Sequence, residues 1–402
     1  MKVLVINAGS SSIKYQLFEM PEQKVLAKGL LEKIGEENSV LTHQALGKST
    51  QIKQPIPNHE LGMQLITQKL TDPEIGVMKN LNEIAAVGHR VVHGGEKFTG
   101  SCIITKEVID AVQEYADLAP LHNPPNLIGI KAATAILPNT PQIACFDTAF
   151  HQTMPKHAYL YAIPYEYYDK YRVRRYGFHG TSHRYVARRA AAMLGKDKTQ
   201  VNVITCHLGN GCSITAVKQG NSIDNSMGLT PLEGLVMGTR AGDIDPGIIF
   251  YLAERLQISI SQITQILNKK SGLLGISGKS NDVRNLLEEA EKGNDRAKLA
   301  LEVFCYRVKK YIGAYMAALG KTDAIVFTGG IGENAAILRE QICDNLDWLG
   351  ISLDRDLNAK TQRKEQCISV SESRVKVFVI PTDEEARIAV DTCEISQNHI
   401  NK

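Results

Sequence analysis

The chain has 402 residues, which is enough for two substantial domains, each with its own hydrophobic core. Its 46 Lys and Arg residues nearly balance its 43 Asp and Glu residues, and this net charge of +3 argues against a dedicated nucleic-acid-binding protein. The sequence has no run of about 18 apolar residues, no signal-peptide pattern and no CxxC among its eight cysteines, so we expect no membrane span and a reduced, cytoplasmic protein.

The first segment predicts a strand, a polar turn and a second strand. Val3–Ile6 is a short apolar run rich in β-branched residues, and residues 13–17 alternate between apolar and polar positions. In the turn between them, Gly9 allows the backbone to approach a ligand closely, and three serines supply hydroxyl and N–H groups. Such a turn is suited to phosphate oxygens, and Lys14 follows at a position from which it could reach an anion.

The next elements place an arginine near the end of a buried strand. Apolar patterns predict a helix over His59–Leu70 and strands over Lys24–Leu31, Ser39–Ala45 and Ile84–Val92. Arg90 lies in the last of these strands, just before a pair of glycines. Because α/β proteins bind ligands at the carboxyl ends of their strands, we interpret Arg90 as a ligand-binding side chain rather than a solvated surface arginine.

Two further elements bring a histidine and a carboxylate to similar positions. Pro124 and Pro125 can open a helix, since proline is tolerated in a first turn, and His122 comes just before it. Gln142–Phe150 predicts a strand that ends at Asp147, and a carboxylate in that position suits a metal or catalytic role. The alternative role for Asp147 is that of a helix cap or turn residue.

Another histidine lies in a loop before a predicted helix. We expect Thr181 or Ser182 to cap a helix that runs through Leu194 and ends at Gly195. His179 lies in the loop just before that cap. Polar loop residues on a rigid scaffold are more often functional than core residues, so His179 is a candidate for the reaction site.

The strand–turn–strand pattern of the N-terminus returns in mid-chain. Val201–Val217 is again an apolar run, a glycine turn and a second apolar run, and Gly209 follows Gly9 by 200 residues. Each turn alone could belong to an ordinary hairpin, since short glycine motifs are common. Together they suggest two duplicated domains that face one nucleotide.

The second half of the chain is rich in glycine loops that alternate with helices. Ser226–Pro246 places Arg240 among glycines, and Ser271–Ser280 is predicted as another Gly/Ser loop. Helices are predicted over Pro246–Leu256, Ile258–Asn268, Asp282–Lys292 and Asp295–Leu319. A strand over Asp323–Phe327 enters a turn of sequence TGGIGEN before a helix from about Ala336, and this arrangement is typical of a phosphate site. A last strand over Val375–Ile380 ends in Pro-Thr-Asp-Glu-Glu, and a helix closes the chain.

Several common kinds of site can be weighed against this pattern. The pairs His89/His93 and His179/His183 have helical spacing, but both lie in β-like or glycine-broken sequence, which disfavours a zinc site. The P-loop pattern GxxxxGK[ST] is absent, and the glycine turns do not fit GxGxxG. Two phosphate-type turns, strand-end carboxylates and arginines in glycine-rich settings instead indicate phosphoryl transfer between two domains.

Ten motifs in order carry a resemblance to a known family. They read VLVINAGSSSIK, GHRVVHGG, PLHNPPNL, CFDTAFHQTMP, RYGFHGTSH, CHLGNG, TPLEGLVMGTRAGDIDP, SGLLGISGKSNDVR, VFTGGIGEN and PTDEE. With these motifs the chain resembles the acetokinase family, within the superfamily of acetate and sugar kinases, heat-shock ATPases and actin, from Met1 to the last helix. Cys212, Asn225, Leu229 and Ala241 depart from the residues expected for the family, Ala, Thr, Phe and Ser, but none is a charged site residue.

The resemblance implies an α/β fold of two duplicated actin-like (ribonuclease H-like) domains with a nucleotide cleft between them. The first domain would comprise residues 1–150 joined by a C-terminal helix over 385–402, and the second, nucleotide-binding domain residues 151–384. The implied activity is reversible transfer of the ATP γ-phosphoryl group to acetate, which gives acetyl phosphate and ADP. Mg²⁺, or Mn²⁺ in its place, is the implied metal, a homodimer is the implied assembly, and domain closure around ATP is expected.

The resemblance also assigns residues to roles. The metal site would include Asn7 and Glu384, with the choice between Glu384 and its neighbour Glu385 left open. The residues assigned to the nucleotide are Lys14, His207, Leu208, Gly209, Asn210, Gly211, Asp282, Val283, Arg284, Gly330, Ile331, Gly332, Glu333 and Asn334. The reacting centre would include Arg90, Asp147, His179 and Arg240, with His122 nearby, and the residues assigned to the acetate methyl pocket are Val92, Leu121, Phe178 and Pro231.

The implied chemistry accounts for these residue types. Acetate is already ionised at pH 7, so no strong base is needed, and the difficulty is to bring one anion against a polyanion. Arg90 and Arg240 can neutralise the carboxylate and the phosphoryl oxygens, and His179 can donate to the transferred group. Asp147 is then more plausible as a positioner of Mg²⁺ or of an arginine than as a base, and we expect direct in-line transfer.

Two other functions compete with this interpretation. A propionate or butyrate kinase of the same superfamily would share the mechanism, and Val92, as a medium-sized wall, favours acetate. An ATP-gated interaction protein like the actin or heat-shock branch would share the fold. In such a protein the two arginines and His179 would be superfluous.

Overall fold

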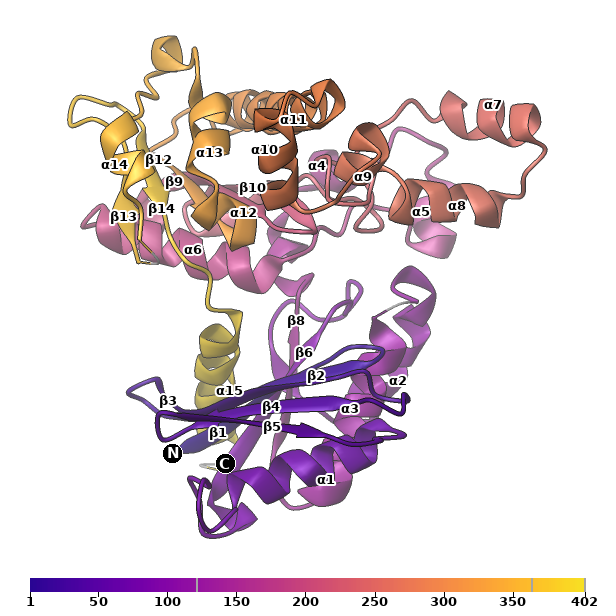
Figure 1. Cartoon of the computed structure of the whole chain (residues 1–402), viewed down its shortest axis with the longest axis vertical. Coiled ribbons are helices and arrows are strands. Elements are labelled where there is room, and N and C mark those ends of the chain that lie inside the picture. The colour runs from indigo at the N-terminus through magenta and orange to yellow at the C-terminus, as the bar shows by residue number, and fades with distance from the viewer. Residues whose placement is uncertain (121, 363, 401–402) are drawn as a thin grey trace. The chain divides into compact units, whose positions relative to one another are not determined.

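The computed structural model describes residues 1–120, 122–362 and 364–400. The chain divides into two compact units, drawn with their elements labelled in Figure 1. Unit 1 is Met1–Phe150 together with Asp383–Lys402, and unit 2 is His151–Thr382, so the chain leaves unit 2 after Thr382 rather than after Glu384. Within the described residues, none of the helices combines the length and apolar character needed to cross a bilayer.

Unit 1 is built on one mixed sheet. In the described part of the chain its strand order is β5-β4-β3-β2-β1-β6-β8-β7. The strands are β1 (Lys2–Ala8), β2 (Ser12–Glu19), β3 (Lys24–Glu32), β4 (Val40–Ala45), β5 (Lys48–Lys53), β6 (Ile84–Val91), β7 (Cys102–Ile103) and β8 (Gln142–Phe146). β1 pairs antiparallel with β2 and parallel with β6, and β6 pairs parallel with β8. The carboxyl ends of β1, β6 and β8 therefore meet at one edge of the sheet.

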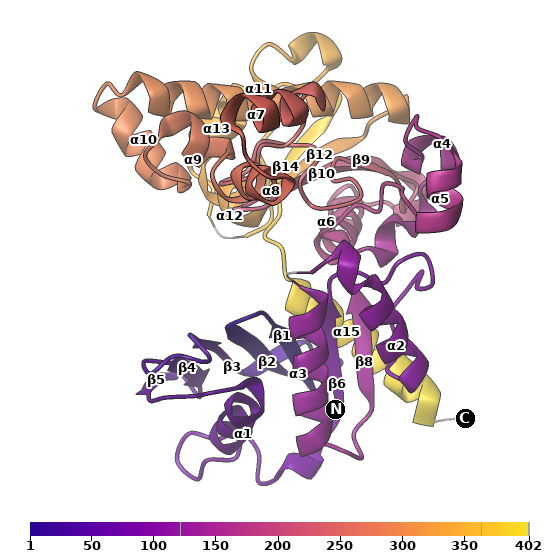
Figure 2. The same cartoon turned by 90° about the vertical axis from the view of Figure 1, so that its right-hand side faces the viewer.

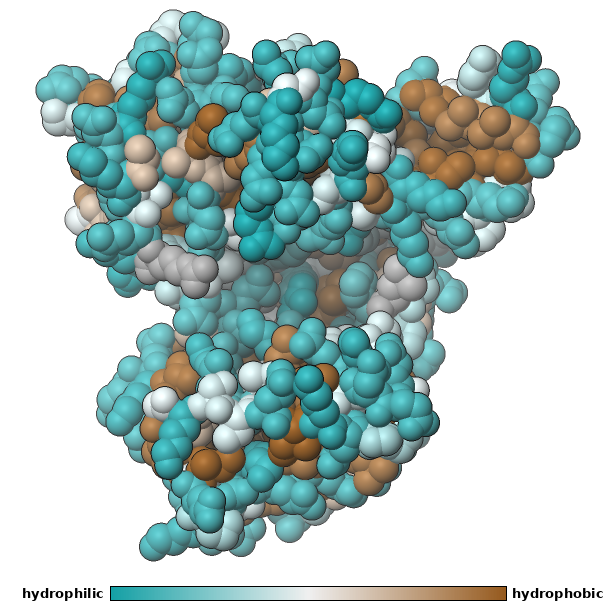
Figure 3. Space-filling model, viewed as in Figure 1, coloured by the Kyte–Doolittle hydropathy of each residue, from teal (hydrophilic) through white to brown (hydrophobic). Residues whose placement is uncertain are grey.

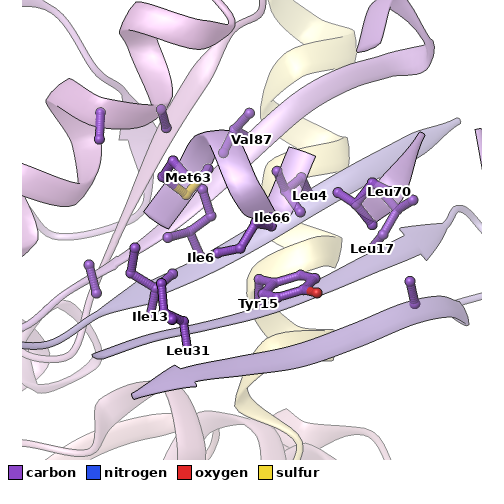
Figure 4. Close-up of a cluster of buried hydrophobic side chains, with 14 of the residues drawn as sticks. Leu4, Ile6, Ile13, Tyr15, Leu17, Leu31, Met63, Ile66, Leu70 and Val87 are labelled. Carbon is purple, nitrogen blue, oxygen red and sulfur yellow. The ribbon is translucent and has the colours of Figure 1, made fainter. Parts of the chain in front are cut away.

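Helices cover both faces of this sheet because β1 alternates its apolar side chains. Leu4 and Ile6 pack in one core with residues of α1 (His59–Leu70) and α3 (Asn123–Ile136), as Figure 4 shows for α1. Val3 and Val5 lie in a second core with residues of α15 (Glu384–Ile400). A strand with period two that is apolar on both faces must be covered on both, so the C-terminal helix completes the N-terminal unit.

Unit 2 repeats the same sheet pattern. Its strand order is β11-β10-β9-β12-β14-β13 in the described residues. The strands are β9 (Asn202–Leu208), β10 (Cys212–Lys218), β11 (Asn221–Asn225), β12 (Ala324–Thr328), β13 (Gln366–Cys367) and β14 (Lys376–Val379). β9 pairs antiparallel with β10 and parallel with β12, as β1 does with β2 and β6. The two glycine turns suggested a duplication, and the strands show what is repeated. Each unit contains an antiparallel hairpin whose first strand also pairs with a parallel strand.

The sheet of unit 2 is also covered on both faces. α6 (Gly180–Met193) packs against β9 and β12, and α11 (Asp295–Leu319) packs against β9 and β10; Figures 1 and 2 show these two helices on opposite faces. The other helices of unit 2 are α4 (Lys156–Tyr159), α5 (Glu166–Tyr171), α7 (Gly247–Leu256), α8 (Ile260–Lys269), α9 (Gly272–Ser277), α10 (Val283–Glu291), α12 (Gly329–Asn334), α13 (Ala336–Cys343) and α14 (Arg355–Ala359). Unit 1 also contains α2 (Lys106–Glu114), and short 3-10 turns span Leu81–Glu83, Tyr115–Leu118, Ala149–Thr153, Lys198–Gln200 and Asp347–Leu349.

Three glycine-rich segments differ from the sequence-based prediction. The expected loop over Ser271–Ser280 contains the short helix α9, and the TGGIGEN turn is itself the helix α12. Each of these helices starts at a glycine with positive φ, Gly272 at 62° and Gly329 at 77°, which turns the chain sharply into the helix. α6 begins at Gly180 with His179 as its N-cap, not with Thr181 or Ser182 as the cap.

Candidate active site

In unit 1, an arginine and a carboxylate meet at the ends of neighbouring parallel strands. Arg90 is on β6, and Asp147 directly follows β8, whose backbone is held to β6 by the bond from Asp147 N–H to Val91 O at 2.9 Å. Arg90 donates from Nη2 and Nε to Asp147 Oδ2, at 2.7 Å and 3.1 Å. Asp147 is only 1% exposed, so this is a buried, charge-assisted pair whose geometry fixes the guanidinium.

Two glutamates at the start of α15 extend this charge cluster. Glu384 Oε2 lies 3.7 Å from Arg90 Nε, whereas Glu385 Oε1 lies 2.5 Å from Lys14 Nζ. Burial opposes the charged form of Arg90, but Asp147 and the two glutamates outweigh it and raise the pKa of the guanidinium. Burial, and then Asp147 and Glu385, raise the pKa of Glu384 to about 7 against the opposing effect of Arg90 and Lys14. The cluster contains three carboxyl groups, those of Asp147, Glu384 and Glu385, and two cations, Arg90 and Lys14. This excess of acidic groups favours the binding of a further cation.

The donor set fits a magnesium ion that is completed by a substrate. In the described residues, no group of three or more His, Cys, Asp or Glu side chains is arranged to hold a metal by itself. Mg²⁺ is commonly bound by one or two carboxylates plus waters and substrate phosphates, and it prefers oxygen donors such as those of Glu384 and Asn7. Asn7 lies on β1, next to the turn that follows this strand. The side chains of Glu384 and Asn7 would suit an open oxygen site of this kind.

An asparagine that the sequence reasoning missed ties two strand ends together. Asn126, in the first turns of α3, donates from Nδ2 to Ala8 O at 2.8 Å and accepts at Oδ1 from Val92 N–H at 3.0 Å. It is buried, and it links the end of β1 to the residue after β6. Val92 is buried beside it, whereas Leu121, assigned with Val92 to the methyl pocket, lies outside the described residues. His122 is the N-cap residue of α3. The sequence did offer one signal for Asn126: it is a polar residue in an otherwise apolar helix, three positions after Asn123.

Unit 2 contains a pocket of about 570 Å³, a size within the range of small-molecule sites. Eight residues assigned to the nucleotide line it: Gly209, Asn210, Asp282, Val283, Arg284, Gly330, Ile331 and Asn334. Asn281, Leu287 and Ala335 also line the pocket, and the sequence reasoning did not single them out. The turn after β9, the start of α10 and α12 thus converge, so motifs that are far apart in the sequence line one pocket.

The remaining residues assigned to the nucleotide do not line this pocket. Lys14 belongs to unit 1, where it pairs with Glu385. Leu208 is buried on β9, and Glu333 accepts at Oε1 from the backbone N–H groups of Gly329 and Thr382. The other non-lining residues are His207, Gly211 and Gly332. Of these residues, Glu333 therefore holds the backbone at the start of α12 rather than forming the surface of the pocket.

Arg240 is a partly buried cation without an acidic partner in the described residues. Its Nη1 donates to Pro231 O at 3.0 Å and lies 3.6 Å from Met237 Sδ, and among the described residues no acidic group lies within 4.0 Å of the guanidinium. Burial therefore lowers the pKa of the guanidinium, with only the thiol of Cys212 acting in the other direction. A guanidinium in this state can take an anion as its counter-charge.

His179 lies next to Arg240 and is held in an unusual backbone conformation. It has a φ of 56°, in the left-handed region that residues other than glycine rarely adopt. A Cβ placed on Gly211 would lie 3.4 Å from Arg240 Nη1 and 3.6 Å from His179 Nε2, so both side chains point at the turn between β9 and β10. The ring of His207 stacks on the ring of His179 with centroids 4.3 Å apart. Phe178, the residue before His179, is buried.

Two α/β units on one repeated sheet pattern, with a nucleotide-sized pocket and arginines set for anions, define a phosphotransferase of the actin-like class. A model of the Acetokinase family matches residues 2–390. The chain is 57% identical to the acetate kinase of Halothermothrix orenii, over 99% of this chain and 100% of that protein, and 57% identical to that of Thermotoga maritima, over 98% of each. The chain belongs to the acetokinase family.

Solved structures agree with this assignment. The acetate kinase of Porphyromonas gingivalis matches with a TM-score of 0.94 and 50% identity, covering 98% of this chain and 99% of that chain. A propionate kinase from Francisella tularensis matches with a TM-score of 0.92 and 45% identity over the same shares. The expected two-domain actin-like fold is thereby confirmed.

Proposed function

We propose that the chain catalyses reversible, Mg²⁺-dependent transfer of the γ-phosphoryl group of ATP to acetate, giving acetyl phosphate and ADP. The observation that supports this proposal most directly is the environment of Arg240. Its guanidinium is partly buried beside His179 and has no acidic partner in the described residues. The full-length similarity to acetate kinases supports acetate as the acceptor.

The chemistry follows from charge rather than from acid–base catalysis. Acetate is ionised at pH 7, so the barrier is the approach of one anion to a polyanion. Two unit charges at about 4 Å repel by roughly 4 kcal/mol at an effective dielectric near 20. In the proposal Arg90 and Arg240 offset this repulsion, and His179 donates a hydrogen bond to the transferred group. In this proposal the phosphoryl group passes in line from ATP to the acetate oxygen, leaving ADP, without a phospho-enzyme.

Asp147 has a positioning role in this mechanism. Its carboxylate accepts three hydrogen bonds from Arg90, two at Oδ2 and one at Oδ1, so it holds the guanidinium in one orientation. Acetate is already ionised at pH 7 and needs no base, so the proposal gives Asp147 no proton to accept. Asn7 and Glu384 would hold the metal ion, with Mn²⁺ able to replace Mg²⁺. When bound, the ion neutralises charge on the phosphate oxygens.

The acceptor pocket sets the choice between carboxylates. We assign Val92, Phe178 and Pro231 to the surface that meets the acetate methyl, together with Leu121. A propionate kinase is the second candidate, because a protein of that name matches this chain at 45% identity. The size of Val92 favours acetate.

One assay tests the proposal. Acyl phosphate formed with ATP and Mg²⁺ is trapped as the hydroxamate, and kcat/KM is compared for acetate, propionate and butyrate. A clear preference for acetate supports the proposal, and a preference for propionate favours the second candidate. ATP binding without acyl phosphate from any of the three would overturn both and favour an ATP-gated binding protein.

We also propose that the chain forms a homodimer through α7. This helix is apolar, yet none of its residues is buried; Phe250 is 69% and Tyr251 65% exposed, and Ile260 at the start of α8 is 62% exposed. Figure 3 shows the resulting hydrophobic patch over α7. An apolar surface of this kind is typical of an interface, and a second copy is the partner that is always present. A Phe250→Glu variant that stays dimeric in sedimentation would exclude this surface.

For the cellular location we propose the cytoplasm. All eight cysteines are free thiols, and six of them are buried. Burial raises the pKa of Cys212 and Cys305 to about 12, which keeps them protonated and unreactive. Thiols in this state are compatible with a reducing compartment. Quantitative alkylation of denatured protein taken directly from cells would support the proposal, and blocked thiols would oppose it.

A further inference from the structure

A chain of hydrogen bonds runs through unit 2 to His179. Thr205 Oγ1 lies 2.7 Å from His183 Nδ1, His183 Nε2 lies 2.7 Å from Ser213 Oγ, and Ser213 Oγ lies 2.8 Å from His179 Nδ1. Thr205 is on β9, Ser213 on β10, and both histidines belong to the start of α6. Thr205, His183 and Ser213 are fully buried, so water does not compete for these bonds.

The two hydroxyl groups fix the direction of this chain. In one direction Thr205 donates to His183 Nδ1, His183 Nε2–H donates to Ser213, and Ser213 donates to His179 Nδ1. In the other direction every donor and acceptor is exchanged, and the Thr205 proton then needs a different acceptor. His183 is the partner of the Thr205 hydroxyl in the described residues, so the second direction leaves a buried O–H without an acceptor. Buried polar groups are nearly always paired, and the first direction holds.

The charge state of His183 agrees with this direction. Burial, and then the neighbouring His151 and His207, hold the pKa of His183 well below its usual range. A neutral imidazole has one donor and one acceptor nitrogen, as a directed chain requires. His151 is itself held by Ser222 Oγ at 2.8 Å and by Phe178 O at 3.0 Å, which anchors the backbone next to His179.

The direction determines which nitrogen of His179 carries the proton. Because Nδ1 accepts from Ser213, the proton of the neutral ring is on Nε2. Nε2 is the nitrogen that faces the turn at Gly211, beside Arg240 Nη1. This series of hydrogen bonds therefore leaves Nε2–H of His179 as a donor, and Nε2 lies on the same side of the turn as the guanidinium of Arg240.

We propose that Ser213 and His183 are positioning residues for the phosphoryl transfer: they hold His179 in the tautomer whose Nε2–H donates to the transferred phosphoryl group. This inference rests on the proposed function for its catalytic meaning, but the tautomer itself is a property of the free protein. Ser213 contacts His179, and His183 contacts Ser213, so both act through His179 rather than on the reacting atoms. The proposal needs only the direction of these hydrogen bonds, and no proton moves along them.

The tautomer is tested directly by ¹⁵N NMR of the full-length protein labelled at histidine. His179 is assigned by the loss of its signals in His179→Gln, and the expected result is a protonated Nε2 with an unprotonated Nδ1. A protonated Nδ1 in the wild-type protein overturns the proposal, whether or not the protein forms acyl phosphate. Failure of the hydroxamate assay with the wild type would instead overturn the proposed function.

Kinetic variants test the positioning role. Ser213→Ala should lower kcat on the order of tenfold, with KM for ATP and acetate nearly unchanged, and should give mixed tautomers of His179. Ser213→Thr keeps the hydroxyl and should restore most of kcat. Thr215→Val is the matched control, because it removes a buried hydroxyl of the same strand that binds Asn225 instead of a histidine. A kcat in Ser213→Ala equal to that of this control overturns the proposal.

Discussion

Arg90 donates two hydrogen bonds to a single oxygen of Asp147, from Nη2 at 2.7 Å and from Nε at 3.1 Å. The pair joins the ends of β6 and β8, and Asp147 has almost no contact with solvent. With this geometry Asp147 sets the direction of a guanidinium whose charge the proposed mechanism uses. The pairing also predicts how the two residues depend on each other.

Arg90→Ala should lower kcat by on the order of 10²-fold or more, because it removes a charge-stabilising donor. Asp147→Asn should also lower kcat, since it loosens the same guanidinium. If Asp147 acts through Arg90, the double variant should be no slower than Arg90→Ala alone. Hydroxamate kinetics of the three variants measure this coupling, and additive losses would give Asp147 a separate role.

Arg240→Ala should lose on the order of 10²-fold in kcat, because it removes the charge that the proposed mechanism places against the phosphoryl oxygens. Arg240→Lys should recover part of the loss, since it restores the charge but not the planar fork. Arg355→Ala is the control, as it removes a surface guanidinium of unit 2 that pairs with Glu340. Wild-type kcat in Arg240→Ala would remove this residue from the mechanism.

Gly330→Ala should raise KM for ATP roughly tenfold while kcat changes little. Gly330 lines the pocket of unit 2, and a Cβ there meets no protein atom within 4 Å, so the protein itself accepts the methyl group. Gly313→Ala on α11 is the matched control, because its Cβ also meets open space, away from the pocket. Equal KM values for ATP in the two variants would exclude Gly330 from the nucleotide site.

The sequence predicts local elements well because their signals are local. The period of α1 and the apolar runs of β1 and β9 fix their bounds within one or two residues. The TGGIGEN segment shows the limit, since its three glycines indicate a loop, but the positive φ of Gly329 starts a helix. Local propensity cannot show this, because tertiary contacts decide whether the residues after the glycine form a loop or a helix.

The site is predictable only as a set of candidates. The residue types at strand ends pointed to Arg90 and Asp147, and the pairing between them follows from adjacent parallel strands. The bond between His179 and Ser213 joins residues 34 positions apart, and Asn126 reaches Ala8 across 118 positions. Such contacts depend on how the sheet orders its strands, and no pattern along the chain encodes them.

The stability of the protein should fall in mild acid, partly through His89. This side chain is buried on β6 beside Gln142, and burial lowers its pKa to about 4 from the usual 6.5. Between pH 6.5 and 4, His89 binds a proton in the unfolded chain but stays neutral in the folded chain. The contribution of His89 to the free energy of unfolding is therefore complete above pH 6.5 and is lost as the pH falls toward 4. The slope is up to about 1.4 kcal/mol per pH unit for this group.

Chemical denaturation at several pH values measures this effect. His89→Asn should flatten the fall in the free energy of unfolding between about pH 6.5 and 4, whatever its effect at pH 8. His157→Asn, at an exposed position, should leave the slope as it is in the wild type. Parallel pH profiles for the wild type and His89→Asn would show that His89 does not carry this dependence.

Val92 provides the test of acceptor selectivity. Its side chain is buried after the end of β6, and its backbone is fixed by the hydrogen bond to Asn126. Val92→Ala should open room for about one methylene group, which is worth roughly 1–3 kcal/mol in favour of propionate over acetate. The ratio of kcat/KM for the two acids measures this change, and Val112→Ala, on the buried face of α2 in a core of unit 1, is the control for a general loss of packing. A ratio that stays at the wild-type value in Val92→Ala would show that another residue forms the wall of the pocket.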